Sequence, residues 1–280
     1  MKLPENKPQI KDNTPKVFFI YGESMTGKTY LARQFKNPLL INTDGNCKKT
    51  DTPSVFVQDY RELIEVLAEV EKGNHSYETI IIDLVDDVET MLVNLICENQ
   101  KDENIESLAD IGFGKGYAMF LSRWKNLMLK LSQMSYYIVF ISHAVTITEN
   151  NITFTKPTLG ARAANACMGR CDLVLETKKI GNSYFQYMRN RRDQYKKEDI
   201  QDPHILGLLE NVYNLFEDED DNIPIPKKKK KKVAPVEDKD MEIQPEETPP
   251  KKTKGGKKTV KDLVEEVESK EDGLLGEDLI

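Results

Sequence analysis

Hydrophobic and polar positions follow two alternating patterns along residues 16–216. Short runs rich in β-branched and aromatic residues are separated by longer segments in which apolar residues recur at helical spacing. This alternation is typical of an α/β fold with a mostly parallel sheet flanked by helices. The predicted strands are Val17 to Tyr21, Leu39 to Asn42, Thr79 to Asp83, Tyr137 to Ser142 and Asp172 to Glu176. The predicted helices are Lys28 to Phe35, Tyr60 to Glu71, Val88 to Asn99 and Tyr117 to Met134.

After Ser142 the pattern favours antiparallel hairpins at the C-terminal end of the sheet. Each hairpin consists of two β-rich runs joined by residues that favour turns. The first pairs Val145 to Thr148 with Ile152 to Thr155, and the second pairs Leu173 to Thr177 with Tyr184 to Met188. Such hairpins extend an otherwise parallel sheet.

The composition changes after residue 216. The segment from Glu217 to Ile280 holds 14 Lys, 19 Asp or Glu, six of the 13 prolines and no aromatic residue. It cannot bury enough apolar surface to offset its ordering entropy, so we expect a disordered charged tail. The chain is therefore divided into a flexible N-terminus (1–15), one α/β domain (16–216) and the tail (217–280).

Three interpretations of the tail stay open. A run of like charges usually remains solvated, so the tail could serve solubility alone. The lysines at 227–232 could contact phosphates or form a nuclear import signal. The apolar end, Leu274 to Ile280, could dock a partner such as a replication or recombination protein.

Charge and cysteine content narrow the class of protein. The formal charge of -7 over 280 residues excludes a uniformly basic nucleic-acid coat, although not a local basic groove. The longest apolar run, Tyr136 to Ile141, is far shorter than the roughly 18 residues that span a bilayer, and residues 1–15 lack the apolar core of a signal peptide. We therefore expect a cytoplasmic protein without a membrane partner. The four cysteines form no CxxC pair and are expected to be buried thiols.

Residues Gly22 to Thr29 match the phosphate-loop pattern GxxxxGK[ST] and lie between a predicted strand and a predicted helix. The glycines let the backbone curl so that successive N–H groups face the phosphates, and the helix N-terminus adds a favourable dipole. Lys28 would neutralise the β- and γ-phosphates of ATP, and the Thr29 hydroxyl would bind Mg²⁺. The candidate ATP-binding residues are Gly22, Glu23, Ser24, Met25, Thr26, Gly27, Lys28, Thr29 and Tyr30.

The predicted strand Thr79 to Asp83 ends in an acidic residue. Ligands of open α/β sheets bind at the carboxyl ends of the strands, so Asp83 is expected to join Thr29 in the Mg²⁺ shell. Leu84 follows, where oligomeric ATPases of the AAA+ type usually have a water-activating Glu. The catalytic carboxylate must therefore come from elsewhere.

With these motifs the chain resembles the RecA-like core, and more closely the phage-encoded P-loop ATPases of single-strand annealing and recombination, whose domain is often placed in an AAA-type family. The resemblance implies a RecA-like P-loop NTPase fold. In RecA-like proteins the water-activating carboxylate follows the second strand, and Asp44 stands there in this chain. Asp is one methylene shorter than the more usual Glu, so we expect slow hydrolysis, with Asp86 and Asp87 as weaker candidates for the role.

The resemblance extends to two further stretches. The segment Gly112-Phe113-Gly114-Lys115-Gly116-Tyr117 is similar to a Gly-Lys-Gly-Tyr segment of these phage proteins. Ser142-His143 occupies the position at which the family has a polar residue that senses the γ-phosphate. The resemblance thus implies that Ser142 or His143 links the nucleotide state to the loop that follows, and a neutral His suits the sensing position.

The resemblance also implies DNA and subunit contacts. In RecA-like proteins the loop and short helix after the sensor line a central channel, which makes Lys156, Arg162 and Arg170 candidate phosphate contacts for single-stranded DNA. The step Arg189-Asn190-Arg191 resembles one that RecA-like subunits extend to a neighbour's ATP. Arg189 and Arg191 would then act in trans as arginine fingers, and the active unit would be a homo-oligomeric ring or filament.

The sequence therefore predicts a Mg²⁺-dependent, DNA-stimulated ATPase that acts on single-stranded DNA in phage recombination or replication, by annealing or strand exchange, in the host cytoplasm. One alternative is a nucleotide-gated adaptor, such as a helicase loader, that hydrolyses ATP poorly and recruits partners through its tail. A small-molecule kinase is a second alternative. It requires an acceptor pocket and a basic lid, and the sequence indicates neither clearly.

Overall fold

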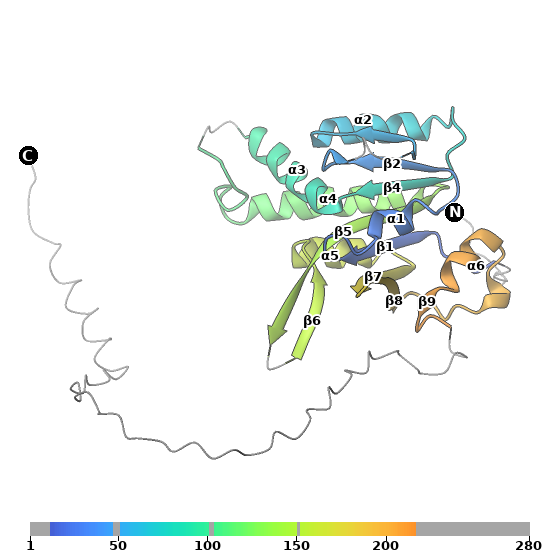
Figure 1. The fold of residues 1–280 in the computed structure, drawn as a ribbon. Helices are drawn as coiled ribbons and strands as arrows, with labels where there is room; N and C mark the ends of the chain where they lie inside the picture. The colour runs from blue at the N-terminus through green and yellow to red at the C-terminus, as the bar shows by residue number, and fades with distance from the viewer. Residues whose placement is uncertain (1–11, 47–50, 101–103, 150–151, 217–280) are drawn as a thin grey trace, which may run out of the picture. The chain divides into compact units, whose positions relative to one another are not determined.

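The computed structural model describes residues 12–46, 51–100, 104–149 and 152–216. They form one sheet in the order β3-β2-β4-β5-β1-β7-β8-β9, with β6 paired to β5 (Figure 1). The strands are β1 (Val17–Gly22), β2 (Pro38–Asn42), β3 (Ser54–Phe56), β4 (Thr79–Asp83), β5 (Tyr137–Glu149), β6 (Ile152–Pro157), β7 (Leu173–Ile180), β8 (Ser183–Arg191) and β9 (Val212–Tyr213). The helices are α1 (Lys28–Ala32), α2 (Tyr60–Glu71), α3 (Val85–Glu98), α4 (Lys115–Gln133), α5 (Ala161–Met168), η2 (Lys197–Asp199) and α6 (Pro203–Leu209).

Strand β1 lies between β5 and β7 and runs parallel to both. All its residues are buried, because both faces of a parallel sheet are covered by helices. Gly22 is in register with His143 on one side and Thr177 on the other. Asp83 of β4 is in register with Asn42 of β2. The carboxyl ends of these strands therefore meet at one edge of the sheet.

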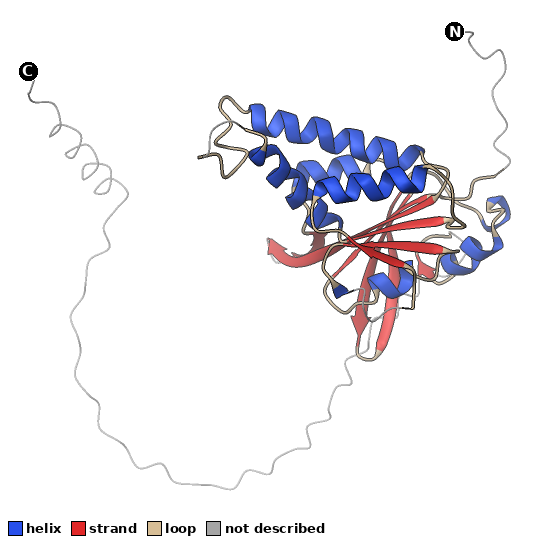
Figure 2. Ribbon diagram, turned by 90° about the horizontal axis from the view of Figure 1, so that it is seen from above, coloured by secondary structure: helices blue, strands red, loops and turns tan. Residues whose placement is uncertain are grey.

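The helices divide between the two faces of the sheet. Helices α2, α3, α4 and α5 pack on the face that contains Phe19 and Phe140 (Figure 2). Helices α1 and α6 pack on the opposite face, against Phe18, Ile20 and Ile141. Alternate residues of β1 thus enter two different cores, as the two-residue period of a strand requires.

The strand and helix predictions are confirmed, two of them to the residue: β4 and α2. Several boundaries were wrong. The predicted strand Tyr137 to Ser142 runs on to Glu149, so the central strand continues into the first hairpin. The predicted helix Lys28 to Phe35 ends at Ala32, and the predicted helix Val88 to Asn99 begins at Val85. The short elements β3, α6 and β9 were not predicted, because segments of two to seven residues are too short to show a period.

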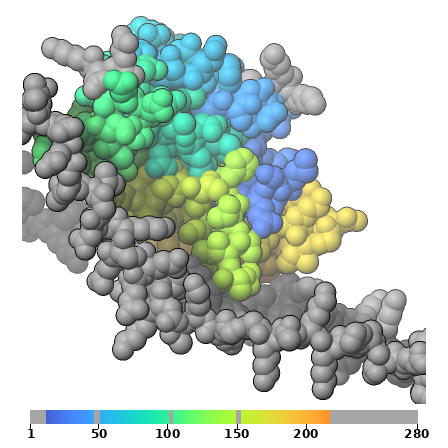
Figure 3. All heavy atoms as spheres, turned by 90° about the vertical axis from the view of Figure 1, so that its left-hand side faces the viewer, coloured from blue at the N-terminus to red at the C-terminus, as the bar shows by residue number. Residues whose placement is uncertain are grey.

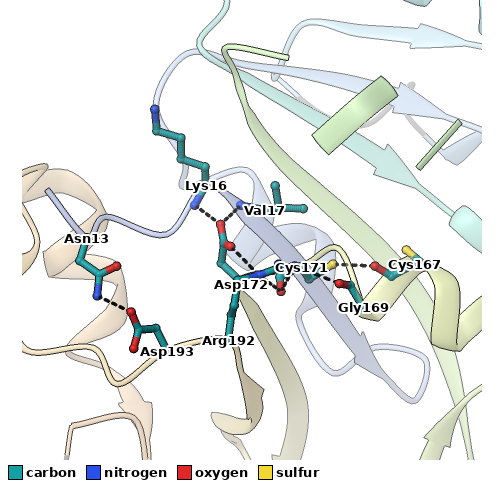
Figure 4. Close-up of polar contacts among 9 residues, drawn as sticks. All are labelled: Asn13, Lys16, Val17, Cys167, Gly169, Cys171, Asp172, Arg192 and Asp193. Atoms are coloured by element: carbon teal, nitrogen blue, oxygen red, sulfur yellow. Dashed lines mark hydrogen bonds and ion pairs between the residues drawn. The ribbon is translucent and has the colours of Figure 1, made fainter. Parts of the chain in front are cut away.

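Asp172 binds the backbone at the start of β1, at the end of the sheet opposite the phosphate loop (Figure 4). Its carboxylate accepts hydrogen bonds from the N–H groups of Lys16 (2.8 Å) and Val17 (3.0 Å) and pairs with Nε of Arg192 at 3.2 Å. Arg192 also donates to the carbonyl of Gly169 at 2.9 Å. Arg192 thus joins the start of β1 to the residues that follow α5.

Three cysteines, Cys97, Cys167 and Cys171, are free and buried, as expected. Cys47 lies outside the described residues, and so do the interpretations of residues 1–11 and of the charged tail. None of the helices in the described part of the chain combines the length and apolar character that crossing a membrane requires.

Trp124 connects two helices that flank the sheet. It is fully buried in α4, and its Nε1 donates a hydrogen bond to the Ala163 carbonyl of α5 at 3.0 Å. Replacement by Phe leaves a cavity and removes this hydrogen bond, so Trp124→Phe should lower the free energy of unfolding by about 2 kcal/mol. Urea denaturation measures this loss. Unfolding is followed by circular dichroism, because Trp124 is the only tryptophan in the sequence and the variant has no tryptophan fluorescence. Lys125→Ala, at the exposed neighbour, is the control, and an equal loss in both variants would contradict the role of Trp124.

Candidate nucleotide-binding site

The phosphate loop connects the buried end of β1 to the first residue of α1. Gly27 has φ 89°, a left-handed conformation that glycine adopts without strain. Within the described residues, the N–H groups of Lys28, Thr29 and Tyr30 form no hydrogen bond. Unpaired N–H groups in the first turn of a helix favour an anion, so this backbone fits a phosphate.

Lys28 lies beneath the loop and is largely buried. Its Nζ donates to the carbonyls of Gly22 and Glu23, at 2.9 Å each, and lies 3.5 Å from Nδ1 of His143. Burial lowers the pKa of Lys28, while the carboxylates of Asp83 and Asp86 oppose this shift. The ammonium group is thus held by carbonyls that a bound phosphate can replace.

Thr29 and Asp83 are in direct contact, because Oγ1 of Thr29 donates to Oδ2 of Asp83 at 2.7 Å. Asp83 is only 4% exposed. Burial raises its pKa to about 6; the Thr29 hydrogen bond and Lys28 oppose this shift, and the neighbouring Asp44 and Asp87 add to it. The protein thus holds a carboxylate where its charge is costly in the absence of a cation.

This oxygen pair fits Mg²⁺, which prefers oxygen ligands and usually binds one or two carboxylates together with substrate phosphates and water. In the described part of the chain no group of three or more His, Cys, Asp or Glu side chains is arranged to hold a metal. Thr29 and Asp83 would therefore hold Mg²⁺ together with a nucleotide. The ion would neutralise charge on the phosphates.

Asp44, the predicted water-activating residue, is exposed beside the site. Its carboxylate accepts hydrogen bonds from Nδ2 of Asn42 (2.7 Å) and from the backbone and side-chain nitrogens of Asn46 (2.9 and 2.7 Å). Partial burial would raise the pKa of Asp44, but these hydrogen bonds and nearby His143 outweigh it and lower the pKa. Asp44 is therefore a carboxylate whose acceptor sites are already partly occupied.

Asp86 connects three parts of the site. It accepts hydrogen bonds from Oγ of Ser142 (2.8 Å), the N–H of His143 (2.9 Å) and Oγ1 of Thr158 (2.6 Å). The end of the sensor segment and the residue after β6 are thus held by one carboxylate at the start of α3. The sequence suggested Asp86 only as a weaker catalytic candidate, whereas its contacts are those of a positioning residue.

Two neighbouring acidic residues of α3 have similar contacts. Asp87 accepts from Oγ1 of Thr43 at 2.6 Å, and Glu89 accepts from the N–H of Gly160 at 2.9 Å. The signal that could have revealed these contacts is the acidic run at the beginning of the helix that follows Asp83. Acidic residues are common in the first helical turn, so this signal alone does not identify a partner.

Arg189 and Arg191 lie on β8, on the side of β1 opposite Asp83. A register shift between β7 and β8 leaves Arg189 as the extra residue of a β-bulge, a feature that re-aims a side chain. Its guanidinium pairs with Glu176, which is buried. Arg191 is opposite Leu173, about 13 Å along the strands from the phosphate loop at 3.3 Å per residue, and donates to the Leu215 carbonyl at 2.9 Å. Arg191 is thus remote from the phosphate loop of its own chain.

The three candidate DNA contacts are all exposed. Lys156 lies on β6, Arg162 on α5 and Arg170 just after α5. The β5–β6 hairpin projects from the molecule on the face shown in Figure 3. A pocket of about 360 Å³ brings Arg162 together with Tyr117 and Phe120 of α4. No aromatic residue stands between these basic residues in the sequence. Tyr117 lies beside Arg162 only in the folded chain, because it belongs to α4, about 45 residues earlier.

The strand order and the phosphate loop at the carboxyl end of β1 define a P-loop NTPase with a RecA-like core, as expected from the sequence. Residues 14–198 match the family model described as an AAA domain. The chain belongs to this AAA domain family.

Individual relatives are more distant. The chain is 28% identical over 134 residues to the SPbeta prophage-derived uncharacterized protein YorG of Bacillus subtilis (strain 168). The match covers 46% of this chain and 41% of that relative, so the chain spans less than half of its length. Two similar solved structures are a KaiC-like protein from Pyrococcus horikoshii OT3 and the flagellar accessory protein FlaH from Methanocaldococcus jannaschii. Their identities are 12% and 11%, their TM-scores 0.35 and 0.31, and the matches cover 64% and 67% of this chain and 80% and 82% of those proteins.

Burial of Asp83 predicts that Asp83→Asn stabilises the ligand-free protein in a pH-dependent way. The pKa of about 6 lies above 3.8, the usual value of an Asp side chain, so the folded state favours the protonated carboxyl. The associated stability is fully present below pH 3.8 and is lost as the pH rises through 6. At pH 8 the variant should be more stable by about 1–3 kcal/mol, whereas near pH 4 the difference should vanish. Urea denaturation across this pH range measures the gain, and an equal gain at both ends would contradict the prediction.

Proposed function

We propose that this protein is a Mg²⁺-dependent ATPase that acts on single-stranded DNA in phage recombination or replication, by annealing or strand exchange. The observation that carries the proposal is the meeting of Lys28, Thr29, Asp83 and His143 at one edge of the sheet. These residues provide a cation for phosphates, two oxygen ligands for Mg²⁺ and a polar group at the γ-phosphate position.

In the proposed reaction the loop N–H groups and Lys28 bind the triphosphate, and Thr29 and Asp83 hold its Mg²⁺. Asp44 orients the attacking water once its carboxylate is released from Asn42 or Asn46. Because these contacts compete with water, turnover is slow until the site rearranges. Binding of DNA would supply that rearrangement.

The contacts of Asp86 support a link between ATP and DNA. One carboxylate holds both His143 and Thr158, and Thr158 directly follows β6, which carries Lys156. A shift of His143 on γ-phosphate binding would therefore be passed to the hairpin, since the two hydrogen bonds end on the two oxygens of one carboxylate. The prophage origin of the YorG relative supports the phage setting.

We propose that the active form is a homo-oligomeric ring or filament in which Arg189 and Arg191 reach a neighbour's ATP. Both residues lie across β1 from Asp83, and Arg191 is remote from its own phosphate loop, which favours action in trans. Arg189 would exchange Glu176 for the phosphate, so Glu176 would hold the guanidinium in the free subunit.

Lys28→Ala should abolish ATP binding, with a loss of affinity of at least about a hundredfold, because the cation that neutralises the β- and γ-phosphates is removed. Isothermal titration with ATP and Mg²⁺ measures the affinity, and circular dichroism checks the fold. Lys36→Ala, which removes an exposed lysine, is the control. Unchanged ATP affinity in Lys28→Ala would refute the phosphate-loop assignment.

Asp44→Asn should lower DNA-stimulated ATP turnover by about a hundredfold while ATP affinity stays near that of wild type, because the proton acceptor for the attacking water is lost. Steady-state hydrolysis with and without single-stranded DNA measures this, with exposed Asp199→Asn as the control. Wild-type turnover that is negligible or indifferent to DNA would instead favour the nucleotide-gated adaptor. The observation that favours this second function is that Asp44 already accepts hydrogen bonds from Asn42 and Asn46, which compete with an attacking water.

A further inference from the structure

Tyr184 is an exposed aromatic residue beside the phosphate loop. It lies near the start of β8, and 52% of its surface is accessible. A Cβ atom placed on Gly27 would be 3.2 Å from Cδ1 of the tyrosine ring, so the ring is in contact with the last glycine of the loop. Lys179 of β7 pairs with Tyr184 across the hairpin, and its Nζ is 5.2 Å from the ring centroid.

The strand order indicates the direction in which a bound nucleotide leaves the loop. The groups for the γ-phosphate and Mg²⁺, His143 and Asp83, lie on β5 and β4, on one side of β1. The other neighbour of β1 is β7, which continues into the hairpin with β8. A triphosphate with its γ end at His143 and its middle on the loop therefore directs its nucleoside toward the β7–β8 hairpin.

We propose that Tyr184 is the stacking platform for the base of the bound nucleoside triphosphate. This inference rests on the proposed function, because it assigns a base subsite to the same phosphate loop. Gly27 allows the close approach of the ring, since any side chain there would meet it. The cation–π contact with Lys179 restricts the ring before the base arrives, which lowers the entropy cost of stacking.

The chemistry of this subsite also predicts its selectivity. Stacking uses the flat face of a base, and every base has one, so Tyr184 contributes affinity without reading the edge of the ring. Replacement by Phe or Trp should preserve the platform, whereas Ala should remove it. Inorganic tripolyphosphate has no base and should be insensitive to all three changes.

The experiment compares the affinities of ATP and inorganic tripolyphosphate, each with Mg²⁺, by isothermal titration. The proteins are wild type, Tyr184→Ala, Tyr184→Phe and Tyr184→Trp, with Phe56→Ala as a control at an aromatic residue of similar exposure, 45%. We expect Tyr184→Ala to bind ATP about tenfold or more weakly, since base–aromatic stacking has this magnitude. Tripolyphosphate affinity should be unchanged, and Phe, Trp and the control should bind ATP as wild type does.

The two ligands separate failure of this inference from failure of the proposed function. If wild type and Tyr184→Ala bind ATP equally, the stacking role is wrong while the nucleotide site stands. If Tyr184→Ala weakens ATP and tripolyphosphate alike, Tyr184 supports the loop and does not stack on a base. If wild type binds neither ligand, the proposed nucleotide site is wrong, and the base subsite with it.

Discussion

The parallel pairing of β1 with β5 and β7 is the constraint on which the site depends. It places Gly22 beside His143 on one side and beside Thr177 on the other. The approach is close, since a Cβ on Gly22 would lie 2.4 Å from the Thr177 hydroxyl. Because β1 has no exposed residue, its register cannot slip without moving a whole buried face, and the position of the loop follows from the core.

A rigid core allows the site to hold groups that are unfavourable on their own. Asp83 is a buried carboxylate whose pKa burial raises to about 6, and burial lowers the pKa of Lys28. Both shifts oppose the charged forms that phosphate and Mg²⁺ chemistry uses. Buried charged groups of this kind lower the free energy of unfolding and are retained for function. Burial of the apolar residues of the strands on both sides of β1 offsets this destabilisation.

The sequence predicted those parts of the fold and site that show a regular spacing of apolar residues or match a motif. The buried strands and long helices have clear periods, and the phosphate loop has a specific pattern. The role of Asp86 could not be predicted, because acidic residues at the start of a helix are common for reasons of the dipole alone. The contact between Gly27 and Tyr184 depends on the register of a hairpin far along the chain, which residue spacing does not determine.

Charge balance leads to an expectation about the order of binding. Lys28, a buried cation, lies close to the carboxylates of Asp83 and Asp86, and Asp44 adds negative charge beside Asp83. A free triphosphate would add further negative charge beside Asp83, whose carboxylate is already unfavourable at neutral pH. A bound Mg²⁺ reverses this interaction, because the same carboxylate then attracts the ion. We therefore expect the metal and the nucleotide to bind as a unit, with Thr29 and Asp83 favouring the complex over either component alone.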